Sequence, residues 1–292
     1  MTPISVVIPA FGRPDSVRRA MLSATDQEGV EVEVLIVDDG SPTPLSKSMG
    51  EVPENVRIIR LDTNSGPGAA RNFGASQASN SAIAFLDSDD SWAPAKLVRQ
   101  EVLLAAGVGV VTDYSVRISG GRSSSVQIDA KRLSDVAYVY VAHPSSLLLT
   151  RTDFDRVGGF PEQRKCAEDW VLFTRLLRAG VDLAHVPEAL TIYNWREGSA
   201  TLDARVRVDH ALGAMQLIVA EGSDHAENRK VVGVTTGRVA QMYANSGEGR
   251  QAVAFVRRAV SSGSAHGAFE ALRVPYLALR GVTRRRFSAR VE

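Results

Sequence analysis

The chain has 292 residues, of which 44% are hydrophobic and 23% are charged, and its formal net charge is +1. This length allows one large α/β domain with an appendage, or two small domains, and the composition excludes a disordered or repetitive protein. A net charge near zero argues against nucleic acid as a partner. The only cysteine, Cys166, excludes an intrachain disulfide and fits a reducing cytoplasm.

The charge is distributed unevenly along the chain. Residues 205–292 hold 14 Arg and Lys against 7 Asp and Glu, which leaves the rest of the chain acidic. The stretch "RGVTRRRFSARVE" (280–292) could contact anionic lipid head groups, or it could be a solvated end. No basic, apolar signal peptide opens the chain, and no apolar run approaches ~18 residues. We therefore expect a cytoplasmic protein without a transmembrane helix, with peripheral contact at the inner membrane face left open.

Apolar, β-branched runs alternate with helical patterns in the first part of the chain. The runs predict strands at residues 4–10, 32–39, 56–61, 82–87 and 108–116. Apolar spacing, with a proline at or near each start, predicts helices at residues 14–27, 67–78 and 94–107. This alternation indicates a mostly parallel sheet with helices on both faces.

The pattern changes twice further along. Residues 118–135 are Gly- and Ser-rich and predict a surface loop or hairpin. Next we expect a strand at 145–150, a helix at 167–180, and short strands at 181–187 and 189–195. From about residue 203 the strand signal ends, and successive helices are predicted at 204–222, 229–247, 249–263 and 267–281. We expect an α/β domain over 1–203, in halves 1–115 and 116–203, and a helical extension over 204–292.

Polar residues gather where the predicted strands end. "PAFGR" follows the first strand, "DDGS" the second and "DSDD" the fourth, so all lie at one edge of a parallel sheet. Asp87, Asp89 and Asp90 are crowded there, and like charges so close together call for a cation. An EF-hand calcium loop is excluded because its sixth and twelfth positions are Trp92 and Val98 instead of Gly and Glu.

An aspartyl phosphatase is one alternative for this acidic segment. In that case Asp87 would be the nucleophile and Asp89 the acid and base. Such a motif normally opens its domain, whereas three strands are predicted before this one.

Five motifs in order carry a family resemblance: "SVVIPAFGR", "VLIVDDGS", "NSGPGAARNFG", "FLDSDDSWAP", and "GGFPE" with "AEDW" downstream. Over roughly residues 3–200 the sequence resembles glycosyltransferase family 2, a family of inverting enzymes. The resemblance implies the A-type nucleotide-sugar fold, a single Rossmann-like sheet with helices on both faces.

The acidic segment resembles the metal motif of that family. By resemblance Asp89 is the ligand of Mn²⁺ or Mg²⁺, and Asp87 lies at the ribose and the metal, with Ser88 also in the donor site. Asp90 is left to cap the next helix or to hold a neighbour.

The resemblance also implies a nucleotide site. Asp39 would accept a hydrogen bond from a pyrimidine N–H while Asp38 holds its loop, and Phe11 would stack unless it is simply a core residue. The donor-binding residues outside the acidic segment are then Pro9, Ala10, Phe11, Asp39 and Arg71.

The acceptor side rests on the start of the 167–180 helix. By resemblance Asp169 is the general base, beside Glu168 and Trp170, whose ring could form a stacking wall for a sugar. Arg196 stands where many members carry a His; arginine binds no metal but could neutralise a diphosphate. The chain's own histidines have no metal-ligand spacing, and we expect core or surface roles for them, although His143 could border the acceptor.

The resemblance implies an inverting transferase of polysaccharide biosynthesis. It would move a sugar from a nucleoside-diphosphate donor, here a UDP-sugar, to a hydroxyl of a glycan, glycolipid or small molecule. The alternatives are a non-catalytic nucleotide-sugar-binding protein and the phosphatase that uses Asp87.

Overall fold

The computed structural model describes residues 2–104, 108–118, 122–162, 167–195 and 204–261. They divide into two compact units. The sheet unit holds the described residues up to 135, then 139–162 and 168–195, and the helical unit holds residues 136–138, 167 and 204–261.

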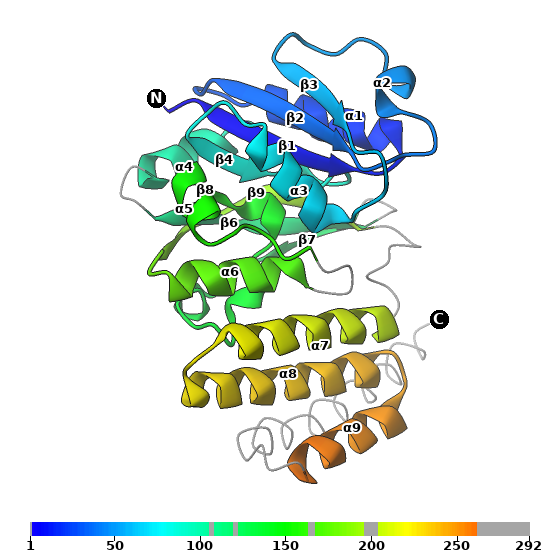
Figure 1. The fold of residues 1–292 in the computed structure, drawn as a ribbon, viewed down its shortest axis with the longest axis vertical. Coiled ribbons are helices and arrows are strands. Elements are labelled where there is room, and N and C mark those ends of the chain that lie inside the picture. Colours follow the sequence, from blue (N-terminus) through cyan, green and yellow to red (C-terminus); the bar gives the residue numbers. More distant parts are fainter. Residues whose placement is uncertain (1, 105–107, 119–121, 163–166, 196–203, 262–292) are drawn as a thin grey trace. The chain divides into compact units, whose positions relative to one another are not determined.

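The first half of the sheet is parallel. Four strands lie side by side in the order β3-β2-β1-β4 (Figure 1). They are β1 (Ile4–Ala10), β2 (Val32–Asp38), β3 (Val56–Arg60) and β4 (Ala82–Phe85). These are the predicted strands, and their carboxyl ends meet at one edge, as βαβ crossovers require.

The second half of the sheet is mixed. β8 (Leu148–Thr150) joins β4 antiparallel, and β6 (Gly109–Ile118) joins β8 antiparallel. Then β9 (Leu183–Trp195) runs parallel to β6, and two short strands pair antiparallel: β5 (Ser91–Trp92) with β9 and β7 (Arg122–Val126) with β6. The predicted hairpin at 118–135 is therefore present as β6–β7.

The prediction of two short strands at 181–187 and 189–195 is wrong, because β9 is continuous. Its pairing with β6 shifts register between Thr112 and Tyr114, so Pro187 is skipped in the ladder. Proline has no N–H to donate, and a bulge lets the strand pass through it.

Helices cover both faces of the sheet. They are α1 (Pro14–Thr25), α2 (Leu45–Ser48), α3 (Pro67–Ser76), α4 (Lys96–Leu104), α5 (Arg151–Arg156) and α6 (Glu168–Arg178). Three 3₁₀ turns lie between β7 and β8: η1 (Ala130–Arg132), η2 (Val139–Val141) and η3 (Pro144–Ser146). Both α1 and α3 begin at a proline, which suits the first helical position because its missing N–H would be unpaired there.

The alternation of side chains along β1 creates two cores. Even-numbered residues such as Val6 pack with Val17 of α1 and Leu97 of α4. The opposite face meets α3, where a Cβ on Gly74 would lie 2.9 Å from Val37 and still closer to Val7. Only glycine lets α3 approach the sheet this closely.

The helical unit contains α7 (Ala204–Glu221), α8 (His225–Asn245) and α9 (Gly249–Ser261) (Figure 1). Val208, Ala211 and Val239 form a buried cluster of their own. Asp224 caps α8 by accepting a hydrogen bond from Ala226 N. The predicted helix at 267–281 lies outside the described residues. Where the structure describes the chain, each helix is too short or too polar to cross a membrane.

Candidate functional site

The three acids after β4 form a tight turn that Asp90 N closes by donating to Asp87 O (2.9 Å). The side chains of the three acids differ in how far they are buried. The side chains of Asp87 and Asp89 are 23% and 34% exposed, whereas that of Asp90 is 1% exposed. Two carboxylates thus border the site and the third lies beneath it.

Arg71 of α3 joins two acids from distant parts of the chain. Its guanidinium lies 2.5 Å from Asp87 Oδ1 and 3.0 Å from Glu168 Oε1, and its side chain is 3% exposed. It also lies over the ring of Phe160, 5.0 Å from the centroid. Burial raises the pKa of Asp87, but the charge of Arg71 and its hydrogen bond outweigh this, so the pKa lies below its usual value. Asp87 therefore stays ionised, and α6 is tied to the end of β4.

Asp90 is held from two strands at once. Its carboxylate accepts hydrogen bonds from Ser145 Oγ (2.7 Å) and Asn194 N (3.3 Å). The Asn194 side chain also donates to Asp89 O (2.7 Å). Burial, and then the negative charge of Asp87, raise the pKa of Asp90 well above its usual value. A cation at this turn would relieve that repulsion.

His143 faces the same acids. Its Nε2 lies 3.6 Å from Asp87 Oδ2, and its Nδ1 lies 3.7 Å from Asp90 Oδ2. Asp87, Asp90 and His143 could hold a metal ion, because one ligand atom from each lies within 4.8 Å of the others. Nδ1 also accepts a hydrogen bond from Ser145 N (3.2 Å), so in the neutral ring the proton sits on Nε2 and points to the Asp87 side. Burial lowers the pKa of His143, which favours that neutral ring.

Glu168 and Asp169 begin α6 at this site. The Arg71 ion pair holds Glu168, and Trp170 N donates to Asp169 Oδ1 (2.8 Å). Burial and the negative charge of Glu168 raise the pKa of Asp169 to about 7. A carboxyl group that titrates near neutral pH is suited to accept a proton in a reaction.

Asp38 and Asp39 organise the loops beside the acidic turn. Asp38 accepts from Ser41 N (2.9 Å) and Leu45 N (3.0 Å), so it holds its own loop. The two Asp39 oxygens accept from Ser65 N (2.7 Å) and Gly66 N (2.9 Å), just before α3. Asp39 thereby places the start of α3 at the carboxyl end of β2.

The segment after β1 reaches toward the same edge. The Phe11 side chain is exposed (49%), so it is not a core residue. Gly12 and Arg13 both have left-handed backbones (φ 63° and 55°), which turn the chain into α1. Arg13 then lies 3.7 Å from Asp89 Oδ2.

The other predicted residues are placed unequally. Pro9 and Ala10 end β1 and are buried, and Ser88 is half-buried in the acidic turn. Trp170 is buried edge-to-face against Tyr140, 5.4 Å between centroids, so its ring is a poor stacking wall for a sugar. Arg196 lies outside the described residues.

Sequence reasoning missed Ser145 and Asn194 and considered His143 only for the acceptor side, so it did not find the group that surrounds Asp90. His143, Ser145 and Asn194 come from a 3₁₀ turn and from β9, which the local patterns did not connect with the acidic turn. The local signal for Asn194 was weak, because β9 also contains the polar residues His185, Glu188 and Thr191. The pairing of β8 with β4 brings η3 next to the acidic turn, and no local sequence pattern encodes that pairing.

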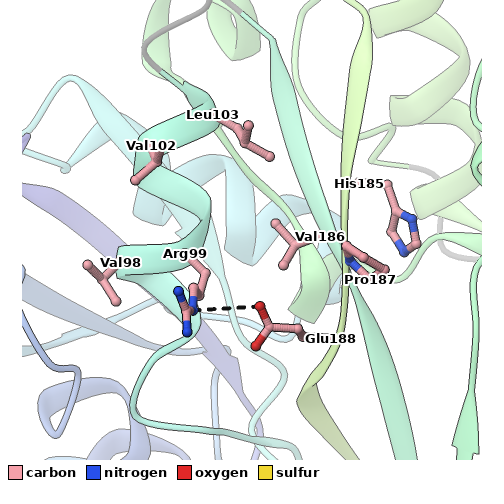
Figure 2. A pocket seen from close by; sticks show the side chains of 8 residues that line it. All are labelled: Val98, Arg99, Val102, Leu103, His185, Val186, Pro187 and Glu188. Carbon is pink, nitrogen blue, oxygen red and sulfur yellow. Dashed lines mark ion pairs between the residues drawn. The ribbon is translucent and has the colours of Figure 1, made fainter.

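A separate hollow of about 360 Å³ lies between α4 and β9 (Figure 2). Val98 and Val102 line it on one side and Val186 and Pro187 on the other, with an Arg99–Glu188 ion pair (3.6 Å). None of the predicted site residues lines this hollow.

The motifs and their geometry agree with the comparison with protein families. Residues 5–141 match the model described as Glycosyl transferase family 2. Residues 5–141 thus belong to glycosyltransferase family 2, and they hold the first four motifs on which the resemblance rests.

Two curated relatives show the range of this similarity. The succinoglycan biosynthesis protein ExoO of Rhizobium meliloti is 34% identical over 225 residues, 71% of this chain and 64% of that protein. The pre-mycofactocin glycosyltransferase of Mycobacterium tuberculosis is 27% identical over 289 residues, 89% of this chain and 59% of that protein. The chain thus spans less than two thirds of either relative.

Solved structures support the fold. The mannosyltransferase PcManGT of Pyrobaculum calidifontis, in complex with GDP-Man and Mn²⁺, has a TM-score of 0.63 at 18% identity, covering 94% of this chain and 80% of that one. S. aureus TarS 1–349 in complex with UDP-GlcNAc has a TM-score of 0.57 at 16% identity, covering 96% and 92%. The predicted A-type glycosyltransferase fold with C-terminal helices is confirmed.

Proposed function

We propose that this protein is an inverting glycosyltransferase that moves a sugar from a UDP-sugar to a hydroxyl of a glycan, glycolipid or small molecule. The Arg71 bridge carries the proposal, because it joins the acidic turn after β4 to the start of α6, where Asp169 titrates near neutral pH. Relatives that bind UDP-GlcNAc and GDP-Man support the nucleotide-sugar donor.

The donor would lie along the carboxyl ends of β1, β2 and β4. The exposed ring of Phe11 stacks on the base, and Asp39 accepts from a base N–H with lone pairs that the Ser65 and Gly66 amides leave unused. Arg71 acts through Asp87, because its two terminal nitrogens already contact Glu168 and Asp87.

The crowded carboxylates at the turn fit a divalent cation, since hard oxygen ligands suit Mn²⁺ and Mg²⁺. We assign the ion to Asp89 from the family resemblance, whereas the residues whose ligand atoms the structure brings together are Asp87, Asp90 and His143. When bound, such an ion supplies charge neutralisation for the departing nucleoside diphosphate.

Asp169 is the proposed general base. It accepts the proton of the acceptor hydroxyl while that oxygen attacks the anomeric carbon from the face opposite the diphosphate. One displacement inverts the anomeric configuration, by the logic that governs inverting glycosidases. Glu168 pairs with Arg71, and its negative charge helps to raise the pKa of Asp169.

The donor site is tested by calorimetric titration with UDP, GDP and dTDP, each with and without Mn²⁺. We expect Mn²⁺-dependent UDP binding that Asp89→Ala abolishes, and unchanged binding in Asp155→Ala, which removes an exposed acid on α5. Preference for another nucleotide corrects the donor, and absence of binding to all three contradicts the proposal.

Asp169→Asn separates an enzyme from a binding protein. The amide keeps the shape of the carboxyl group but accepts no proton, so we expect normal UDP affinity and loss of sugar transfer. A binding protein would show no transfer in the wild type. An aspartyl phosphatase would instead form a phosphorylated Asp87 and would not need a nucleotide.

Membrane contact through residues 280–292 is part of the proposal for a cytoplasmic enzyme with a lipid-linked acceptor. Its support is the basic sequence of this stretch. Co-sedimentation with anionic vesicles should fall when residues 280–292 are removed, and equal binding would contradict the contact.

A further inference from the structure

Ser145 is fully buried on η3, and each of its polar groups has a partner. Its Oγ donates to Asp90 Oδ2 (2.7 Å) and accepts from Asp87 N (3.1 Å). Its backbone N–H donates to His143 Nδ1 (3.2 Å). One hydroxyl therefore connects the first and last acids of the turn, and the same residue orients the imidazole beside them.

The backbone oxygen of Ser145 is anchored from the other side. It accepts hydrogen bonds from Trp92 Nε1 (2.7 Å) and Thr191 Oγ1 (3.1 Å). Trp92 lies only two residues beyond Asp90. Ser145 therefore contacts Asp90 through its hydroxyl and Trp92 through its backbone oxygen. This closed arrangement restricts how far Asp90 and η3 can move apart.

A buried polar cluster supports η3 from α4. Gln100 Nε2 donates to Ser146 O (2.8 Å) and Val110 O (2.6 Å), and Gln100 Oε1 accepts from Lys96 Nζ (2.6 Å). Lys96 Nζ also lies 4.1 Å from the centroid of the Trp92 ring. All of these groups are buried, where an unmade hydrogen bond is costly, so the cluster keeps the turn in one position.

We propose that Ser145 is a positioning residue of the donor site: its hydroxyl sets the spacing of the Asp87 and Asp90 carboxylates, and with it the affinity for the divalent cation and the diphosphate. Ser145 touches neither the donor nor the cation. The inference rests on the proposed function, because it assumes that this turn receives a nucleoside diphosphate with its metal.

The chain offers a close control at Ser5 of β1. Ser5 is also fully buried, its Oγ donates to Glu33 Oε1 (2.5 Å) and accepts from Asn80 N (3.1 Å). The two serines thus share burial, a carboxylate acceptor and a backbone N–H donor. Ser5, however, begins β1, at the end of the parallel strands opposite to the acidic turn.

The test compares Ser145→Ala with Ser5→Ala in the full chain. Each loses one hydrogen bond to a carboxylate and one from a backbone N–H, so we expect both melting temperatures to fall. Calorimetric titration with UDP at fixed Mn²⁺, and with Mn²⁺ at fixed UDP, reads the site. Only Ser145→Ala should weaken both affinities, on the order of tenfold, since it alone removes a hydrogen bond from a carboxylate of the acidic turn. High Mn²⁺ should restore much of its UDP binding, which a general loss of stability would not allow.

Ser145→Cys is the second variant, because it preserves shape with a weaker donor; it carries the test if Ser145→Ala does not fold. Its affinities should lie between those of the wild type and Ser145→Ala. Wild-type Mn²⁺-dependent UDP binding with equal affinities in the Ser145 and Ser5 variants overturns this inference alone. Absence of such binding in the wild type overturns the proposed function and this inference with it.

Discussion

At the scale of single residues, the site is a balance of buried charge. Arg71 is the cation in direct contact with Asp87 and Glu168, and it lies against Phe160 rather than water. Buried ion pairs add little net stability, but removing one partner leaves the other charges uncompensated. Arg71 is therefore required first for the integrity of the site.

Arg71→Met should destabilise the protein by about 3–5 kcal/mol and abolish UDP binding, because two partly buried carboxylates lose their buried partner. Arg71→Lys should recover only part of this, since one ammonium group cannot reproduce the planar fork that contacts both acids. Urea unfolding measures the first effect and calorimetry the second. A stable Arg71→Met variant with normal UDP affinity would show that the bridge is dispensable.

The pKa of Asp169 predicts how activity depends on pH. An ordinary aspartate is fully ionised by about pH 5–6. Asp169 titrates at about 7, so kcat/KM should rise with pH through that region. Glu168→Gln removes a negative neighbour and should move this rising limb to lower pH. Steady-state transfer rates between pH 5 and 9 check the prediction, which fails if the limb stays in place.

Stability should show the opposite trend for the same group. The pKa of Asp169 is about 7 in the folded chain against 3.8 for a free aspartate, so the unfolded chain loses its proton first as pH rises. The group's contribution to stability is therefore lost between about pH 4 and 7. The melting temperature of Asp169→Asn should decrease less between pH 4 and 7 than that of the wild type.

At the scale of elements, α4 carries an unusual buried cation. Lys96 is enclosed beside Trp92 and Gln100, and burial lowers its pKa well below the usual 10.5. As the pH falls below 10.5, Lys96 becomes protonated in the unfolded chain before it does so in the folded chain. The free energy of unfolding therefore decreases as the pH falls.

Lys96→Met should remove that dependence. The melting temperature of the wild type should rise relative to the variant as pH increases from 7 toward 10. At neutral pH the variant should be about as stable as the wild type, because it removes a buried charge but leaves Gln100 Oε1 without its donor. Parallel melting curves across this range would contradict the assignment of a buried, proton-releasing Lys96.

Elements with a local signal were predictable and those with a distant partner were not. β1 begins and ends at the predicted residues, since Ile4 to Ala10 is an unbroken buried run. The two-residue β5 and the short α5 have no periodicity long enough to recognise, and β9 was divided at Pro187 because the bulge depends on its neighbour. Among site residues, Asp87, Asp89 and Asp169 were found from motifs, whereas Ser145 meets Asp90 only through the pairing of β8 with β4.

At the scale of the whole molecule, the described part of the chain divides into two units whose buried residues cluster separately. The sheet unit is built on β1 and its neighbours, and the buried residues of α7, α8 and α9 form separate clusters. A ligand that binds only the folded sheet unit stabilises that unit by mass action. At a ligand concentration of 100 Kd, the free energy of unfolding rises by about 2.7 kcal/mol.

Hydrogen exchange with UDP and Mn²⁺ should therefore slow in the segments around Asp39, Arg71 and Asp87 and stay unchanged in α8. Mass spectrometry of the exchanged peptides, with and without the ligands, makes this comparison. Equal slowing in α8 would show that the helical unit shares the stabilisation.

The packing around the acids has an optical consequence. Two of the three tryptophans contact residues of the site. Trp92 donates to the backbone oxygen of Ser145 in η3, and Trp170 donates its backbone N–H to Asp169. Indole emission depends on nearby charges and on what its N–H contacts, and Trp92 has both an ammonium group over its ring and a carbonyl on its nitrogen. The native fluorescence of the unlabelled protein is thus a built-in reporter of charge entering the acidic turn.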